Sequence, residues 1–282
     1  MIKNPVIGII GGTGAMGQMF KNFLFKKYGY TVIIGSRSTG LSPEECAKRS
    51  DVLIITVPIH KTIEMIQNIA QFVKKDGLIL DFTSIKIKPL EAMLNYSQSN
   101  VLGTHPMFGK GLKSLKNQTV IICPGRGKKW QEWYIDLLKK ENIKVKVCTA
   151  EEHDKMMAII QGMIHFTMIN IGHVFKELNI DIYNTLQFSS PIYKLRLDMV
   201  GRVLNQDPNL YAGIELNNPE IIGVLKQYLK SSEQLFSIIS HGDYNSFKKY
   251  FNEASDYFGS FKEEASIVSN KVINFLSEKI GK

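Results

Sequence analysis

The stretch from Gly8 to Gly17 limits the possible folds of this chain more than any other part of its sequence. Residues 6–10 have the apolar character of a buried strand, and apolar residues recur at helical spacing after the stretch. Glycines lie between this strand and this helix at G-x-G-x-x-G spacing. In that context the spacing predicts a dinucleotide site, because a Cβ would keep a pyrophosphate away from the N–H groups at the helix N-terminus. The alternative is a glycine-rich turn that binds nothing. The predicted cofactor-binding residues are Gly12, Thr13, Gly14, Ala15, Met16 and Gly17.

The composition is typical of a globular protein with a large core. Of the 282 residues, 44% are hydrophobic and 22% are charged, which suits two domains. No segment has the pattern of a signal peptide, and we expect no apolar run long enough to span a bilayer. Cys46, Cys123 and Cys148 lack metal-ligand spacing. We therefore expect no metal site, and reduced thiols in a cytoplasmic protein.

The formal net charge of +9 comes from basic residues spread along the whole chain. Pairs such as Lys26–Lys27 and Lys248–Lys249 fall at helix ends or on polar helix faces, which favours solvated faces over a nucleic-acid surface. A positive field also suits an anionic cofactor and an anionic substrate. We expect neither a nucleic acid nor a membrane as partner.

The first half of the sequence alternates short apolar strands with helical segments. This alternation predicts an α/β fold in which residues 1–150 form a Rossmann-type, doubly wound parallel sheet with right-handed crossovers. The expected strands are Val6–Ile10, Thr31–Gly35, Val52–Val57, Gly77–Phe82, Val101–His105, Thr119–Cys123 and Lys144–Cys148.

The pattern changes at Thr149. Residues 149–152 match a capping box, with Thr149 as the N-cap and Glu152 at the third helical position. The helix that follows is apolar on most sides, so we expect it inside a helical bundle or a subunit interface. No strand pattern of comparable strength returns, which predicts an all-helical domain over residues 151–282.

The end of the second expected strand bears on the choice of cofactor. A carboxylate there would bond the adenine ribose of NAD, but the residues present are Ser36 and Arg37. A hydroxyl and a guanidinium suit a 2′-phosphate, which favours NADP over NAD. The alternative is that Arg37 is a solvated loop residue and NAD is used. Val57 and Pro58, after the third strand, are expected beside the nicotinamide, and His60 is expected to open the next helix rather than to do chemistry.

Polar segments at residues 81–86, 103–109 and 189–202 lie where a substrate is expected, beyond the carboxyl ends of the strands. With the glycine turn, these segments resemble prephenate dehydrogenase, and most of all the dehydrogenase half of bifunctional chorismate mutase–prephenate dehydrogenases. The first strand begins at once, so we expect a monofunctional form without the mutase. The matching pieces are residues 11–17, Val57–His60, Ser84–Lys86, His105–Gly109, Glu152–Asp154, Ile160–Gln161, His165–Phe166, Ser189–Tyr193, Met199–Arg202 and Gln206–Pro208.

The resemblance implies an oxidative decarboxylation of prephenate to 4-hydroxyphenylpyruvate and CO2, on the route to tyrosine. It makes His105 the acceptor of the C4 hydroxyl proton and Ser84 the residue that orients the hydroxyl or the imidazole. The alternatives are a structural loop histidine and a helix N-cap. Lys86 is expected to support the site or the cofactor. His153 is explained by capping electrostatics at the start of the long helix.

The resemblance also implies anchors for the two substrate carboxylates. Arg202 matches an arginine that holds one of them, since a guanidinium binds a carboxylate through two hydrogen bonds. A second family arginine is replaced by Lys194, and whether Lys194 or Arg196 takes its place stays open. Gln161 and His165 are expected to line the substrate pocket, although a buried, satisfied histidine is the alternative for His165.

The family pairs its helical domains into a homodimer, which suits the apolar helix. Alternative functions are an arogenate dehydrogenase, and a β-hydroxyacid or imine oxidoreductase with the same two domains. An alternative of another class is a nucleotide-sensing module without turnover. Such a module would have no need of His105, Ser84 or Arg202.

Overall fold

A computed structural model describes residues 2, 4–36 and 38–280. The chain forms two compact units, which we describe separately. The first comprises Met1–Ile160 and Asn209–Glu220, and the second comprises Gln161–Pro208 and Ile221–Lys282. The division into domains at residue 150 stays a prediction.

The first unit is built on a seven-stranded sheet with the order β2-β1-β3-β4-β5-β6-β7. Every expected strand forms, and strands β1 to β5 are parallel, which confirms the doubly wound plan. The strands are β1 (Ile7–Ile10), β2 (Val32–Gly35), β3 (Val52–Ile55), β4 (Leu78–Asp81), β5 (Asn100–Pro106), β6 (Thr119–Arg126) and β7 (Lys144–Val147).

The sheet is not wholly parallel, in contrast to the prediction. Strand β6 runs antiparallel to β5, and β7 is parallel to β6. The physical reason lies in the connection at residues 107–118, which contains no helix. A parallel partner needs a crossover, usually a helix, whereas a chain that turns back directly pairs antiparallel.

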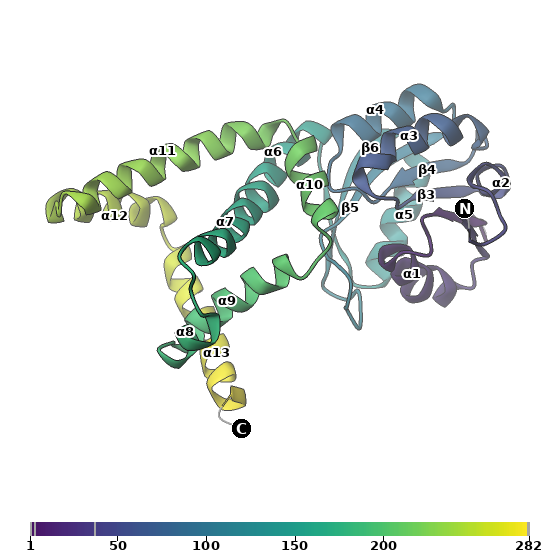
Figure 1. Cartoon of the computed structure of the whole chain (residues 1–282). Helices are drawn as coiled ribbons and strands as arrows, with labels where there is room; N and C mark the ends of the chain where they lie inside the picture. The colour runs from purple at the N-terminus through teal and green to yellow at the C-terminus, as the bar shows by residue number, and fades with distance from the viewer. Residues whose placement is uncertain (1, 3, 37, 281–282) are drawn as a thin grey trace. The chain divides into compact units, whose positions relative to one another are not determined.

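Helices cover both faces of this sheet (Figure 1). One face packs against α1 (Ala15–Phe20), its continuation η1 (Lys21–Phe25) and α5 (Lys128–Lys140). The other face packs against α2 (Pro43–Arg49), α3 (Ile59–Ile69), α4 (Ile87–Tyr96) and α6 (Ala150–Met157). Because both faces are covered, β1, β3 and β4 are wholly buried and read as continuous apolar runs.

The carboxyl ends of β1, β3, β4 and β5 meet at one edge of the sheet. The strand order reverses between β1 and β3, because β2 lies on one side of β1 and β3 lies on the other. Ligands of such sheets bind outside this edge. The glycine turn follows β1, Val57 and Pro58 follow β3, the 82–86 loop follows β4, and His105 lies near the end of β5.

The second unit is all-helical over its described residues, as predicted. Its elements are η4 (Ala158–Met163), α7 (Ile164–Glu177), α8 (Ile182–Gln187), α9 (Pro191–Leu204), α11 (Glu220–Ser240), α12 (Tyr244–Phe258) and α13 (Phe261–Ile280). The first unit takes most of α10 (Pro208–Asn217). Within the second unit α7 packs on α11 through Phe166 and Tyr228, whose ring centroids are 6.0 Å apart.

The long apolar helix begins where the capping box predicts. The Thr149 side chain accepts a hydrogen bond of 3.1 Å from the backbone N–H of Glu152. The helical stretch Ala150–Glu177 is 28 residues long, with a mean hydropathy of 1.3 in its most apolar window. By length and composition it can cross a membrane, contrary to the expectation that no run would suffice. A helix of this kind equally suits the subunit interface that the sequence predicts.

Candidate active site

The glycine turn after β1 packs too tightly for side chains. Gly11 has φ +81°, and a Cβ on it would lie 2.5 Å from the carbonyl oxygen of Thr56. A Cβ on Gly17 would lie 2.6 Å from the Cα of Gly12. The turn is stiffened by Gln18, whose side-chain amide donates to the carbonyl oxygen of Gly12 at 2.6 Å. Glycine is therefore needed at positions 11 and 17 for the helix N-terminus to lie close to the end of β1.

This helix N-terminus fits the pyrophosphate of a dinucleotide. The N-cap Gly14 is extended, no side chain caps the helix, and its first turn contains no acidic residue. Thr13, Gly14 and Ala15 are exposed, and the N–H of Gly14 donates to the carbonyl oxygen of Gly11 at 2.9 Å within the turn. Because α1 continues into η1, the helix is long enough to present a positive end to an anion.

The loop after β2 is rich in hydroxyl groups. Thr39 Oγ1 donates to the carbonyl oxygen of Ile34 at 2.8 Å and accepts from the N–H of Ser36 at 3.1 Å. The hydroxyls of Ser36 and Ser38 lie 3.0 Å apart. The described residues of this loop, 35–36 and 38–40, include no carboxylate. Arg37 lies outside the described residues.

The segment after β3 lies at the same edge. Val57 is half-buried against the core, and Pro58 is exposed and precedes α3 as its N-cap. His60 is exposed in the first turn of α3, which agrees with its expected place at the start of that helix.

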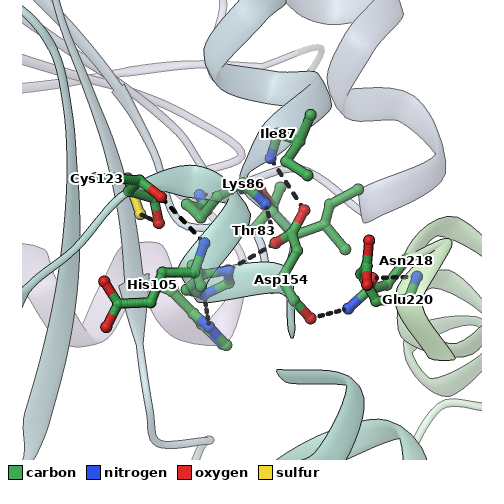
Figure 2. Close-up of polar contacts among 12 residues, drawn as sticks. Thr83, Lys86, Ile87, His105, Cys123, Asp154, Asn218 and Glu220 are labelled. Atoms are coloured by element: carbon green, nitrogen blue, oxygen red, sulfur yellow. Dashed lines mark hydrogen bonds and ion pairs between the residues drawn. The ribbon is translucent and has the colours of Figure 1, made fainter. Parts of the chain in front are cut away.

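His105 is the most enclosed of the predicted site residues that can take up a proton. It is 3% exposed on β5, and its Nδ1 lies 2.9 Å from Nε2 of His153 on α6. The other nitrogen of His153, Nδ1, lies 2.7 Å from Oδ1 of Asp154. Asp154 also accepts the backbone N–H groups of Lys86 at 2.8 Å and Ile87 at 3.1 Å. Figure 2 shows this chain of contacts between β5, α6 and the start of α4.

A buried ion pair fixes the loop between β4 and α4. Both Lys86 and Asp81 are fully buried, and Nζ of Lys86 donates to Oδ2 of Asp81. Nζ also donates to the carbonyl oxygen of Thr104 at 2.8 Å, directly before His105. Oδ2 of Asp81 accepts the N–H of Thr83 at 3.0 Å. The pair thus joins this loop to the strand that carries His105, in the supporting role expected for Lys86.

The environment keeps His105 neutral. Burial holds the pKa of His105 well below its usual value of 6.5, and the charge of a protonated His153 and that of Lys86 act in the same direction. Burial also lowers the pKa of His153, against the opposing effect of Asp154. An imidazole that is neutral at working pH has one nitrogen free to accept a proton.

Ser84 lies half-buried in the loop between β4 and α4, beside the strand that carries His105. The alternative role of Ser84 as a helix cap is wrong. The N-cap of α4 is Lys86, and the N–H groups of its first turn donate to Asp154 from α6. The hydroxyl of Ser84 is therefore not used to start the helix.

The other predicted substrate residues belong to the second unit. Gln161 lies in the π-helical turn η4, and His165 lies one turn later in α7. On α9, Nζ of Lys194 pairs with the Asp198 carboxylate at 2.8 Å, whereas Arg202 is exposed and forms no ion pair with a described residue. Their roles toward a substrate stay predictions.

Sequence reasoning missed the parts played by His153, Asp154 and Asp81. His153 was explained by helix capping alone, yet it is buried against His105. The partner of Asp81 could have been predicted in kind. A carboxylate at the end of a wholly apolar strand is buried and needs a positive or hydrogen-bonding partner. For His153 and Asp154 no local signal exists, since their partners lie 48 and 68 residues away along the chain.

Comparisons with known proteins agree with this architecture. The prephenate dehydrogenase nucleotide-binding domain matches residues 34–147, and the prephenate dehydrogenase dimerization domain matches residues 149–253. A probable arogenate/prephenate dehydrogenase of Methanocaldococcus jannaschii is 37% identical over 298 residues, which cover 99% of this chain and 67% of that protein. The T-protein of Haemophilus influenzae is 33% identical over 258 residues, which cover 92% of this chain and 68% of that protein.

Solved structures agree in fold. The prephenate dehydrogenase from A. aeolicus, in complex with hydroxyphenyl propionate and NAD+, has a TM-score of 0.76. The match covers 91% of this chain and 98% of that one at 16% sequence identity, so it bears on the fold alone. Sequence and fold together confirm the resemblance. The chain belongs to the prephenate dehydrogenase family, a family of NAD(P)-dependent oxidoreductases.

Proposed function

We propose that this chain converts prephenate to 4-hydroxyphenylpyruvate and CO2, with NADP as the favoured cofactor. The observation that carries the proposal is the buried, neutral imidazole of His105 at the edge of the sheet where the glycine turn also lies. A nucleotide sensor has no need of a buried proton acceptor at that edge.

The reaction needs a hydride acceptor at C4 of the ring and a proton acceptor at the C4 hydroxyl. NADP or NAD, bound at the glycine turn, supplies the first. His105 supplies the second, because the hydroxyl becomes a carbonyl only if its proton leaves. Ser84 hydrogen-bonds the hydroxyl and directs it toward His105. Loss of the ring carboxylate as CO2 then restores an aromatic ring, and the C4 oxygen takes back the proton from His105 to give the phenol.

The residues of the second unit supply charge for the two carboxylates of the substrate. Arg202 is the stronger anchor, because its guanidinium binds a carboxylate through two parallel hydrogen bonds. Lys194 contributes a point charge that is shared with Asp198. Gln161 and His165 provide further polar groups on the substrate. Arogenate stays an alternative substrate, which the name of the Methanocaldococcus jannaschii relative includes.

The preference for NADP rests on the loop after β2. Hydroxyl groups of Ser36, Ser38 and Thr39 gather there without a carboxylate among the described residues, and Arg37 adds a positive charge in the sequence. A 2′-phosphate is thereby bound rather than repelled, whereas the ribose of NAD lacks its usual carboxylate partner. We further propose a cytoplasmic homodimer that forms through the region matched by the dimerization domain.

A two-by-two assay tests the proposal. Prephenate and arogenate are each mixed with NADP and with NAD, and the absorbance of the reduced nicotinamide is followed. The proposal expects the largest kcat/KM for prephenate with NADP. Turnover of arogenate but not prephenate would overturn the substrate assignment, and a larger kcat/KM with NAD would overturn the cofactor assignment. Binding of dinucleotide without turnover of either acid would favour the sensing module.

A further inference from the structure

The hydrogen bonds of Asp154 determine which nitrogens of the two histidines carry protons. Both carboxylate oxygens accept backbone N–H groups, Oδ1 from Lys86 and Oδ2 from Ile87. A carboxylate has no proton to donate, so Asp154 is the acceptor in each of its side-chain contacts. The 2.7 Å contact between Oδ1 and Nδ1 of His153 consequently needs a proton on that nitrogen.

The assignment carries over to His105. A neutral imidazole has one N–H and one bare nitrogen, so His153 with its proton on Nδ1 offers a bare Nε2. The 2.9 Å contact between that nitrogen and Nδ1 of His105 needs a proton on the latter. His105 then has its bare nitrogen at Nε2. The hydrogen bonds from His105 to His153 and from His153 to Asp154 thus impose the tautomer of His105 that has its proton on Nδ1.

The geometry points to His153 as a positioning residue that fixes the tautomer of His105 and takes up its second proton during turnover. This inference rests on the proposed function for the identity of the reaction. It assigns to His153 and Asp154 a role that the glycine turn and the substrate anchors do not require.

The proton transfer balances along the chain of contacts. The C4 hydroxyl gives its proton to Nε2 of His105, and the proton on Nδ1 of His105 passes to Nε2 of His153. His105 is then neutral again as its other tautomer, and His153 is an imidazolium beside the carboxylate of Asp154. The positive charge thus comes to rest next to a negative group rather than next to the cofactor. When CO2 leaves and the ring becomes aromatic, the C4 oxygen is a phenolate. The reverse transfers return the proton to this oxygen and restore the starting tautomers of both histidines.

The charged groups around His105 favour this direction of transfer. Lys86, after β4, faces it with a positive charge that Asp81 neutralises, and His153 and Asp154 face it from α6. The positive charge of Lys86 disfavours a proton on either histidine, whereas Asp154, within 2.7 Å of His153, favours a proton on His153. Because His153 is 1% exposed, Asp154 rather than water stabilises the charge that His153 takes up.

The first test is a spectroscopic one that needs neither substrate nor variant enzyme. Two-dimensional 15N–1H spectra of the imidazoles report which ring nitrogen is protonated, and the chain has six histidines to assign. We expect both His105 and His153 at neutral pH to be protonated at Nδ1 and bare at Nε2. A proton on Nε2 of His105 in the wild-type protein would overturn the inference.

The second test separates positioning from proton uptake. His153→Phe keeps a ring but accepts no hydrogen bond, and we expect kcat to fall by about 10- to 100-fold, a part of the ~10²–10⁴ that a positioned proton acceptor contributes. His153→Gln offers an amide oxygen to Nδ1–H of His105 but cannot be protonated. We expect it to retain the tautomer and to recover part of kcat. The exposed His241 provides the control His241→Gln, for which we expect wild-type values.

The outcomes distinguish this inference from the proposed function. Cofactor affinity and the thermal midpoint are measured for each variant, so that a fall in kcat with both unchanged reports the chemistry. If the spectra show the expected tautomers and prephenate is not turned over, the relay stands and the proposed substrate fails. If prephenate is turned over and His153→Phe has the kcat and tautomer of the wild type, the relay fails and the proposed function stands.

Discussion

Replacing Lys86 by methionine tests the buried ion pair that holds the loop after β4. Each side chain of the pair is 0% exposed. Without the ammonium group, the carboxylate of Asp81 stays buried with Thr83 and a long 3.4 Å contact from the N–H of Thr104. Removing one partner of a buried pair costs about 3–5 kcal/mol. We expect the free energy of unfolding of the first unit to fall by this amount.

The assay is unfolding in urea followed by tryptophan fluorescence. The two tryptophans of the chain, Trp130 and Trp133, both lie on α5, so the signal reports the first unit and not the second. With an m-value of about 2 kcal/mol/M, the midpoint of Lys86→Met falls by about 1.5–2.5 M relative to the wild type.

Lys74→Met is the matched control. Nζ of Lys74 pairs with Asp51 at 2.8 Å, but the two side chains are 41% and 36% exposed. An exposed pair contributes about 0–1 kcal/mol, so its midpoint shifts by less than about 0.5 M. The double variant Asp81→Asn, Lys86→Met removes the stranded charge and is expected to recover much of the loss. Equal shifts for Lys86→Met and Lys74→Met would refute the reasoning.

Three further predictions concern the site. Arg202→Gln is expected to raise the KM for prephenate by about 10- to 100-fold without changing cofactor affinity, because a charge-assisted pair is lost. An equal rise in the control Arg49→Gln, at an exposed arginine of α2, would contradict this. The acid limb of kcat/KM is expected below pH 6.5, since His105 is protonated and inactive only when the pH falls through its lowered pKa; a limb at or above pH 6.5 would contradict this. Ser36→Asp is expected to lower kcat/KM with NADP relative to kcat/KM with NAD, because a carboxylate bonds the ribose and repels a 2′-phosphate. An unchanged ratio of the two values would show that this loop does not select the cofactor.

Local patterns in the sequence predict most of the first unit. Each strand was expected from an apolar run between turn residues, and the capping box at Thr149 marked the start of α6. These features depend on neighbours a few residues away, so they can be read from the sequence alone. The antiparallel turn of β6 was missed because strand direction depends on how the chain returns to the sheet.

The candidate site was predicted only in part, for the same physical reason. The position of His105 follows from its place at the end of an apolar run. Its partner His153 reaches it only because the sheet returns through β6 and β7 before α6 begins. Asp154 likewise caps a helix to which it is not adjacent in the chain. Contacts of this range follow from the packing of the whole unit and not from any local spacing.

The steady-state kinetics of His105→Asn show whether the imidazole of His105 accepts the hydroxyl proton. The asparagine amide can still donate to Nε2 of His153 in place of Nδ1–H, but it offers no basic nitrogen to the substrate. We expect kcat with prephenate to fall by about 10²–10⁴-fold while the Kd for the dinucleotide stays unchanged. A kcat close to that of the wild type would show that the hydroxyl proton goes elsewhere.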